Sequence, residues 1–421
     1  MKNSLRTYKA AISGALLLSS SAIIPQAIAS NGLFALGYGA KQVGIAGSGV
    51  AFPQDALIAS INPAGVVFVG EQNNINLQYF SPSRGYSVEG PIGAFPPFPG
   101  ATVHSDSENF FIPSMALSRS ISSKASIGIA IYGNGGMNTD YASHDTPFGA
   151  GTFGADHTGV DYAQIFTNLN YSRKFADGKA SWGIAAILNY SYLRMEGLNS
   201  FASFSADPSN LSDNGYDHAF GLGLRIGVLA EVTPGLRLAA SYQTKIKNTF
   251  DDYAGLFTHG GEFDIPAHAQ IGLAADIGPG VLTADIQQIQ YSQSDAIGNT
   301  SRSLLTGGQL GDKVGFGWDD MTIYKVGYTW SQQDDLTWRI GASYGQQPIP
   351  SDEVTFSIVA SGTIEQHYTA GFSKTLDNGN LLDVAFMYAP EKCVSGGHLF
   401  NPADSVELCM DQFSIDVGLS F

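Results

Sequence analysis

The chain has 421 residues, of which 14% are charged, 11% are aromatic and 50 are glycine, and its mean hydropathy is +0.01. With 21 basic and 37 acidic residues its formal charge is -16, which argues against nucleic acid as a partner, because phosphate binding needs a clustered excess of Lys and Arg. The composition is also unusual for a soluble enzyme of this length, because glycine and aromatic residues are frequent and charged residues are few.

The first 29 residues have the features of a secretory signal peptide. Three basic residues precede an apolar stretch at 10–24, and the small residues Ala27 and Ala29 suit signal peptidase. We expect cleavage after Ala29, which leaves 18 basic against 37 acidic residues and a formal charge of -19.

A segment rich in Gly and Ala follows, from Ser30 to Gln72, without convincing alternation before Val66. Within it, Asn62-Pro63-Ala64 predicts a rigid bend, because proline fixes its own φ and restricts the residue before it. The Asn62 side chain could then hydrogen-bond a backbone group of a neighbouring wall. An ordinary turn before the first strand is the alternative.

Beyond residue 72, apolar and polar residues alternate along the chain. The clearest case is C-terminal, where Phe413, Ile415, Val417, Leu419 and Phe421 alternate with polar or small residues. After the leader no apolar run approaches the ~20 residues that a spanning helix requires. In lipid only helices and closed barrels satisfy every backbone group, so a membrane span would have to be a β-barrel. A water-soluble sandwich would show the same alternation in a single strand, and the spacing of the turns separates the two.

Turn signals set the number of strands. Short polar breaks alternate with much longer connections, and these breaks lie at 122–124, 177–179, 233–235, 279–280, 332–335 and 377–380. Six tight turns and seven long loops predict fourteen antiparallel strands, a pattern typical of outer-membrane barrels. We expect strands at 73–82, 108–121, 125–136, 160–176, 180–195, 216–232, 236–250, 263–278, 281–294, 319–331, 336–347, 361–375, 381–391 and 409–421.

A barrel of this size encloses a lumen wider than its side chains fill. We therefore predict a plug of residues 30–72 inside a barrel of residues 73–421. A flexible periplasmic tail is the alternative. A general porin needs an open, strongly charged lumen, so the predicted plug argues against that function.

The two cysteines, Cys393 and Cys409, flank the last long loop. Because exported proteins meet an oxidising compartment, we expect one disulfide between them. Two free thiols are the alternative.

The chain resembles the FadL/TodX outer-membrane transporters of long-chain fatty acids and aromatic hydrocarbons. The order and spacing of several short motifs carry the likeness over essentially the whole mature chain: Asp55-Ala56 with Asn62-Pro63-Ala64-Gly65, Ala284-Asp285-Ile286 to Tyr291-Ser292, Trp318-Asp319-Asp320 with Tyr324-Lys325-Val326-Gly327, Arg339-Ile340-Gly341 with Tyr344, Pro348-Ile349-Pro350, and His367 to Gly371-Phe372.

This resemblance implies a monomeric fourteen-stranded barrel in the bacterial outer membrane, with an N-terminal hatch. It also implies surface capture of a hydrophobic ligand, an internal pocket, and lateral exit at a kinked third strand. Long-chain fatty acids are the first expected substrate, and aromatic or alkane hydrocarbons are the alternative. In this sequence Gly133, Gly135 and Gly136 at the end of the third strand would permit the kink, although they could instead start a loop.

Two further groups of residues are candidates for ligand contact. Phe95, Phe98, Phe148 and Phe153 lie in predicted surface loops and would form the capture site, since exposed apolar clusters usually mark binding surfaces. The alternative is that these loops pack on one another as a lid.

Inward-facing cations would meet a fatty-acid carboxylate. Alternation turns Lys325 and Arg339 into the lumen on neighbouring strands, and Arg225 likewise. An inward cation could bind the ligand carboxylate by a charge-assisted hydrogen bond. Alternatively, these cations pair with lumen acids such as Asp285 or Asp383.

Enzyme motifs match by letters only. Gly341-Ala-Ser343-Tyr-Gly345 resembles a nucleophile elbow but lies inside an alternating strand, and Gly149-x-Gly151-x-x-Gly154 lacks a surrounding strand and helix. The eight histidines form no close-spaced ligand set. We therefore expect no catalysis, metal or cofactor, with an outer-membrane lipid hydrolase as a remote alternative.

Overall fold

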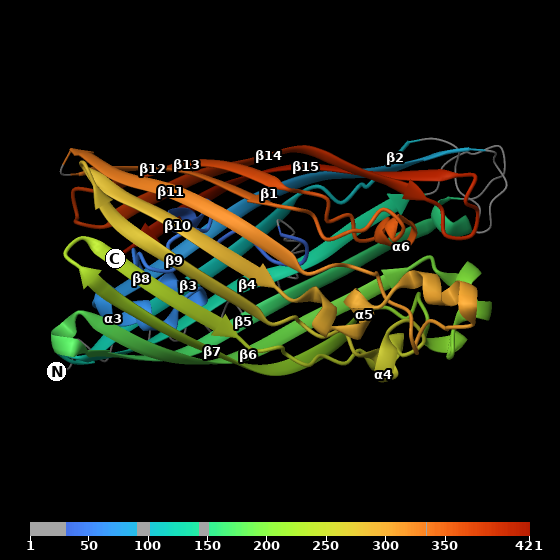
Figure 1. Ribbon diagram of the computed structural model, residues 1–421, viewed down its shortest axis with the longest axis horizontal. Helices are drawn as coiled ribbons and strands as arrows, with labels where there is room; N and C mark the ends of the chain where they lie inside the picture. Colours follow the sequence, from blue (N-terminus) through green and yellow to red (C-terminus); the bar gives the residue numbers. More distant parts are fainter. Residues whose placement is uncertain (1–30, 91–101, 143–150, 334) are drawn as a thin grey trace.

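The strands of the computed structural model, which describes residues 31–90, 102–142, 151–333 and 335–421, form one closed antiparallel sheet. From β3 to β15 each strand pairs with the next in sequence, β1 pairs with β3 and with the short β2, and β15 pairs with β1 to close the ring. Figure 1 shows an elongated barrel whose strands are inclined to its long axis. The predicted fourteen-stranded barrel is confirmed, with one additional two-residue strand, β2. The expected leader, 1–29, lies outside the described residues.

The strands are β1 (Gln72–Glu89), β2 (Val103–His104), β3 (Phe110–Ser122), β4 (Ala125–Ala142), β5 (His157–Phe175), β6 (Ala180–Glu196), β7 (Asp217–Thr233), β8 (Leu236–Gln243), β9 (His268–Ile277), β10 (Gly280–Ile289), β11 (Met321–Gln333), β12 (Leu336–Gly345), β13 (Gln366–Thr375), β14 (Leu381–Gly397) and β15 (Ser405–Ser420). The short helices of the loops are η3 (Thr152–Gly154), η4 (Ala176–Gly178), η5 (Asn199–Phe204), η6 (Pro208–Asn210), η7 (Asp251–Tyr253), α4 (Thr258–Gly261), η8 (Tyr291–Gln293), α5 (Asp295–Gly298), η9 (Ser301–Thr306) and α6 (Val354–Ser357).

The largest differences from the expected strands are at the loop end of the barrel. β1 continues to Glu89 rather than ending at 82, although Pro82 carries no N–H to donate. The pairing of β1 with β3 stops at Phe80, whereas its pairing with β15 continues to Glu89. The pairing with β15 therefore carries the strand beyond the proline, and β2 pairs with the other edge only at Gly85 and Tyr86. β8 and β9 are shorter than expected, at Leu236–Gln243 and His268–Ile277.

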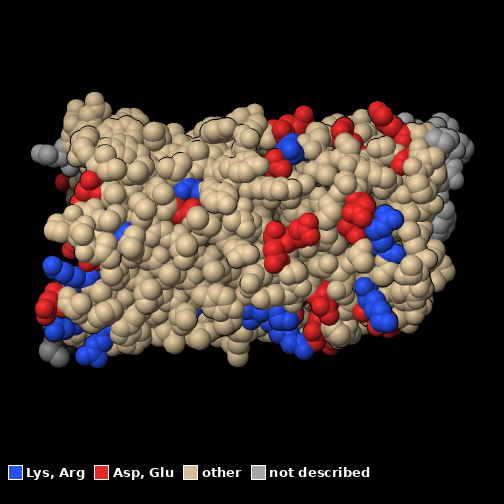
Figure 2. All heavy atoms as spheres, viewed as in Figure 1, with Lys and Arg blue, Asp and Glu red and all other residues tan. Residues whose placement is uncertain are grey.

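The outer wall is apolar and the inner wall is polar, as the alternation predicts. On β7, Phe220 and Leu222 are 79% and 76% exposed, whereas Arg225 is fully buried. On the face in Figure 2, charged side chains gather at the left rim and over the right half, and are sparse between. The zone with few charged side chains is where we expect the hydrocarbon layer of the membrane to surround the barrel. Among the described residues, no helix has the length and apolar character needed to cross a membrane.

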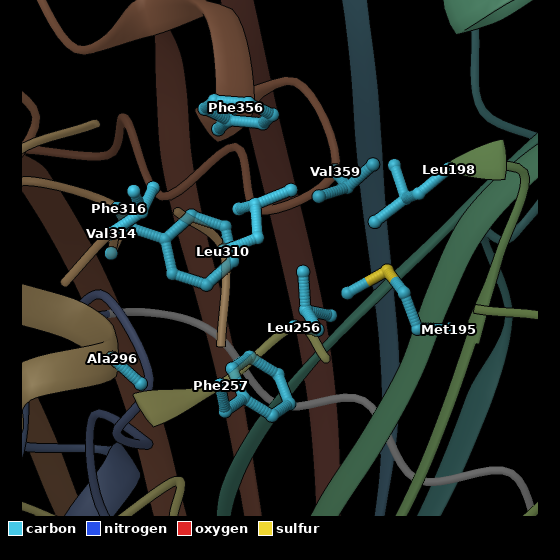
Figure 3. A pocket seen from close by; sticks show the side chains of 11 residues that line it. Met195, Leu198, Leu256, Phe257, Ala296, Leu310, Val314, Phe316, Phe356 and Val359 are labelled. Carbon is cyan, nitrogen blue, oxygen red and sulfur yellow. The ribbon is translucent and has the colours of Figure 1, made fainter. Parts of the chain in front are cut away.

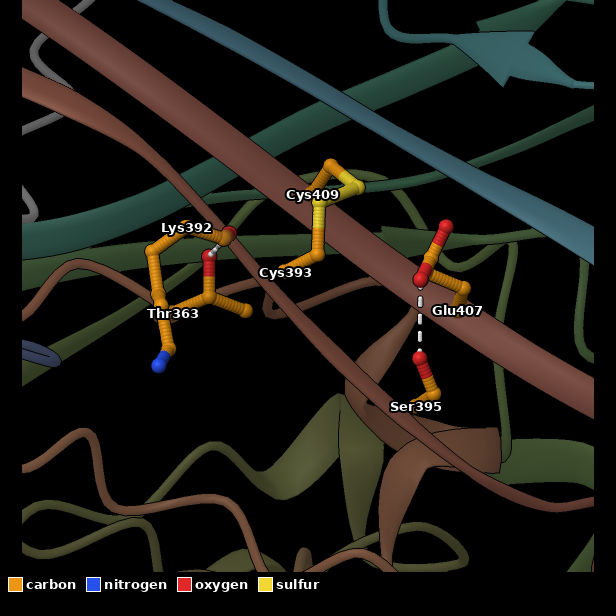
Figure 4. Close-up of a disulfide and its surroundings, with 6 residues drawn as sticks. All are labelled: Thr363, Lys392, Cys393, Ser395, Glu407 and Cys409. Carbon is orange, nitrogen blue, oxygen red and sulfur yellow. Dashed lines mark hydrogen bonds between the residues drawn. A yellow bond between two sulfur atoms is a disulfide. The ribbon is translucent and has the colours of Figure 1, made fainter.

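The last two strands carry a disulfide between Cys393 and Cys409, which lie opposite each other in the β14–β15 pairing. Figure 4 shows it beside two further contacts of the same strands. Thr363 Oγ1 donates to the Lys392 carbonyl at 2.7 Å, and Ser395 Oγ donates to Glu407 at 2.8 Å. The disulfide thus lies within a longer hairpin than expected, since β14 continues to Gly397 and β15 begins at Ser405.

We expect that replacing Cys393 and Cys409 together by Ser lowers the free energy of unfolding by about 3 kcal/mol, because the disulfide restricts a loop of this length in the unfolded chain. Urea unfolding of the two proteins under oxidising conditions measures the difference. Reduced parent protein serves as the control and should match the double variant. Thiol labelling of both cysteines in unreduced, denatured parent protein would contradict the pairing.

Candidate transport path

Residues 31–71, here called the N-terminal segment, lie within the ring of strands, where Figure 1 shows them in blue. Short helices make up much of the segment, and these pack against strands on several sides of the barrel. They are α2 (Ala40–Val43), η1 (Ala56–Ser60), η2 (Pro63–Gly65) and α3 (Val66–Val69). Lys41 is buried and lies 3.7 Å from Asp55 of the same segment and 3.5 Å from Asp383 of β14.

Asn62 connects this segment to the barrel wall. It precedes η2 and its Oδ1 accepts a hydrogen bond from Ala64 N at 3.0 Å, while its Nδ2 donates to the carbonyls of Val50 and Val228 at 2.9 and 3.2 Å. Glycine on β7 allows this approach. A Cβ atom at Gly227 would lie 2.0 Å from Asn62 Oδ1.

A second close contact joins the segment to the glycine-rich part of β4. The β4–β5 register shifts between Gly133 and Gly135. Beyond Tyr132, β4 no longer pairs with β3, and the segment occupies the edge that is freed. Ala35 N donates to Asn134 O and Gly136 N donates to Leu33 O, both at 3.1 Å.

Small cavities lie beside the place where the β3–β4 pairing ends, here called the interruption of the wall. One lies between the segment and strands β1, β3, β4 and β15 where the β3–β4 pairing ends, and is lined by Tyr38, Ile112, Ser114, Tyr132 and Gly133 among others. Tyr38 donates to Asn134 Oδ1 at 2.8 Å. The glycines named from sequence therefore lie at an irregularity of β4, which continues to Ala142 rather than ending in a loop at Gly136.

The three inward cations contact the N-terminal segment. Lys325 Nζ donates to the carbonyls of Leu36 and Gly47 at 3.2 and 3.4 Å, and Arg339 Nε donates to Gln54 Oε1 at 2.8 Å. Arg225 donates to the Ser60 carbonyl and to Gln243 Oε1. A ligand carboxylate could reach these cations only if the segment moved, so carboxylate binding by Lys325, Arg339 and Arg225 stays a prediction.

The loops at the other end of the path enclose an apolar pocket (Figure 3). Its lining residues are Met195, Leu198, Leu256, Phe257, Ala296, Leu310, Val314, Gly315, Phe316, Phe356 and Val359. They come from β6, α5 and α6, and from the segments between β6 and η5, between η7 and α4, between η9 and β11 and between α6 and β13. The open volume is about 30 Å³, so an extended hydrocarbon chain can enter only if these side chains move apart.

Of the four phenylalanines expected to capture the ligand, only Phe153 lies among the described residues. Phe95, Phe98 and Phe148 lie outside the described residues. Phe153 is fully buried, and its ring centroid lies 5.2 Å from Phe201 and 6.3 Å from Phe356. Phe153 thus packs between loops, as in the lid alternative.

Polar contacts hold the loops over the apolar pocket. Glu353, beside α6, accepts hydrogen bonds from Ser301 N at 3.0 Å and from the hydroxyls of Ser301 and Thr300. Burial raises the pKa of Glu353, and the hydroxyl donors oppose that rise. The carboxylate joins the loop before β13 to the loop before β11, from which Leu310, Val314 and Phe316 reach the pocket.

Two polar groups in the lumen were not singled out as functional from sequence. Ser343 Oγ lies 3.0 Å from His367 Nδ1, and Gln412 Nε2 lies 3.2 Å from the other ring nitrogen. An amide thus occupies the position that an orienting carboxylate has in a catalytic triad.

The second group is Arg84 of β1, which lies beyond the expected end of the first strand. Its position among the inward residues Phe80 and Pro82 could have revealed it.

Comparisons with known proteins agree with this architecture. The family model described as outer membrane protein transport protein (OMPP1/FadL/TodX) matches residues 21–398. No curated protein matches the sequence.

Three solved structures are similar over nearly their whole length. The Pseudomonas putida toluene transporter TodX is 18% identical, with 91% of this chain and 98% of that chain covered and a TM-score of 0.65. A Pseudomonas aeruginosa FadL homologue is 15% identical, with 93% and 99% covered and a TM-score of 0.69. The Ralstonia pickettii toluene transporter TbuX is 16% identical, with 91% and 98% covered and a TM-score of 0.63. At these identities the likeness shows the fold.

Proposed function

The chain belongs to the OMPP1/FadL/TodX family of outer membrane transport proteins, and from that premise we propose that it takes up hydrophobic small molecules passively, with long-chain fatty acids as the first substrate. It is an outer-membrane transport channel rather than an enzyme, so the lipid-hydrolase alternative does not hold. The proposed path runs from the loop pocket past the N-terminal segment to the interruption between β3 and β4.

The apolar pocket of the loops is the observation that carries this proposal. Its eleven lining residues include three phenylalanines and no charged or hydrogen-bonding side chain. Transfer of an alkyl chain into such a site contributes about 0.8 kcal/mol for each buried CH₂ group. A pocket of this composition suits hydrocarbon groups and offers nothing to ions or sugars.

The N-terminal segment serves as the plug of this path in our proposal. Its contacts with β7, β11 and β12 support a closed resting state. The register shift at Gly133 and Gly135 and the end of the β3–β4 pairing support lateral exit at this place. A hydrophobic molecule leaving here would enter the membrane without crossing bulk water.

Aromatic or alkane hydrocarbons are the second candidate substrates. The lack of any charged side chain among the lining residues of the loop pocket favours them. Mass spectrometry of ligands that co-purify with the protein from its own membrane would separate the two classes, since only fatty acids carry a carboxylate.

We expect Ala296→Leu to weaken oleate and toluene binding at least tenfold, because three added carbon atoms overfill a pocket of about 30 Å³. Ligand binding to detergent-solubilised protein is the measurement. Ala403→Leu, the same change at an exposed residue, is the control and should bind like the parent. Parent-like binding by Ala296→Leu would exclude this pocket from the path.

A further inference from the structure

Arg84 is a buried cation that forms no ion pair with an acidic residue in the described part of the chain. The charge of Glu108 acts on it at longer range. The residue is 3% exposed, and among the described residues no Asp or Glu oxygen lies within 4.0 Å of its guanidinium. Nη2 donates to the Ser107 carbonyl at 2.6 Å, and the guanidinium carbon lies 5.8 Å from the centre of the Phe110 ring. Nε is buried and has no hydrogen-bond partner.

Burial of a charge is costly unless the charge is paired and hydrogen-bonded. Lys325, Arg339 and Arg225 each donate to at least two oxygen acceptors, of which at least one belongs to the N-terminal segment. Arg84 has one carbonyl acceptor and an aromatic ring. Its buried Nε therefore keeps a donor that an anion could use.

Arg84 lines a small cavity, with an open volume of about 10 Å³, that adjoins the loop pocket. Arg84, Asn138, Thr139 and Ser361 contribute polar residues to its lining. Val359 lines both this cavity and the apolar pocket. The cavity beside Arg84 and the apolar pocket therefore adjoin at Val359.

We propose that Arg84 binds the carboxylate of an amphiphilic monoacid whose hydrocarbon chain occupies the loop pocket. The inference rests on the proposed function and deepens it, because it selects carboxylates over neutral hydrocarbons. A guanidinium presents parallel N–H donors that match a carboxylate in two-point contact. Burial strengthens such a contact, since water competes weakly there. A monoanion suits one cation, whereas a phosphate dianion would call for more positive charge than Arg84 supplies.

The experiment compares oleate with oleyl alcohol, which has the same chain and no charge. We expect Arg84→Gln to weaken oleate binding at least tenfold and to change oleyl alcohol binding less than twofold. Arg84→Lys keeps the charge without the planar donor pair and should give an intermediate loss for oleate. Arg302→Gln, at an exposed loop arginine, is the control and should bind both ligands like the parent.

Each other outcome overturns the proposal in a distinguishable way. Equal losses for both ligands, or an Arg84→Gln barrel that loses its heat-resistant mobility on a denaturing gel, would make Arg84 a structural residue. Unchanged oleate binding would refute its contact with the carboxylate while leaving hydrophobic uptake intact. Selective oleate loss in a Lys325→Met, Arg339→Met double variant, and not in Arg84→Gln, would transfer the role to those cations. If the parent binds neither ligand, the proposed function fails as well.

Discussion

Deletion of residues 30–65 is expected to convert a closed barrel into an ion-conducting one, with at least a tenfold rise in single-channel conductance. In our proposal the segment plugs a lumen that fourteen strands leave wider than their own side chains fill. Its removal also frees the Lys325, Arg339 and Arg225 head groups from their acceptors in the segment. The lining that remains is polar and would admit water and ions.

Planar bilayer recordings provide this measurement, with the full-length protein in the same membranes as the control. The deletion variant must keep the gel mobility of a folded barrel, so that conductance is attributed to an opened lumen. Near-zero conductance through a folded deletion variant would refute the plug, because it would show that the N-terminal segment does not close the lumen.

Asn62→Ala is expected to undock the N-terminal segment, with a loss of about 2–4 kcal/mol in docking free energy. The change removes hydrogen bonds to Val50 O, Val228 O and Ala64 N. A buried donor or acceptor left without its partner costs about 1–3 kcal/mol. The effect is partial because water can enter the space left by the amide.

Hydrogen exchange of the amides at 31–71 should become at least tenfold faster in this variant, and brief conductance events should become more frequent. Asn378→Ala, at an exposed residue of the turn between β13 and β14, removes the same side chain away from the segment and should leave both measurements unchanged. Parent-like exchange in Asn62→Ala would show that the wall contact does not hold the segment.

The alternation of residues determines much about this protein without further information. Because side chains alternate along a strand, Phe220 and Leu222 face outward and Arg225 faces inward. The same alternation holds for every strand of a closed barrel that separates lipid from the lumen. The tight turns set the strand number, because each allows only one antiparallel return. The lone cysteine pair in an exported chain likewise predicts its disulfide.

Strand ends were harder to predict at the loop side. Pro82 ends the local strand signal, yet pairing with β15 extends β1 through Arg84 to Glu89. That pairing joins residues more than 300 positions apart in the chain, so no local window contains it. The expected strand therefore ended at 82 and left out Arg84, although the alternation through Phe80 and Pro82 continues to it.

The partners of the inward side chains were decided by the tertiary structure alone. Alternation places Lys325 and Arg339 in the lumen, but it carries no information about whether a ligand, an acid or the N-terminal segment meets them there. The loop pocket is a similar case, since Met195 lies on β6 while Leu256, Phe316 and Phe356 come from three separate connections, and these converge only when the barrel closes. Sequence periodicity determines which side of a wall a residue faces, because that depends on its immediate neighbours. What each residue touches depends on long-range closure, which brings distant segments into one lumen.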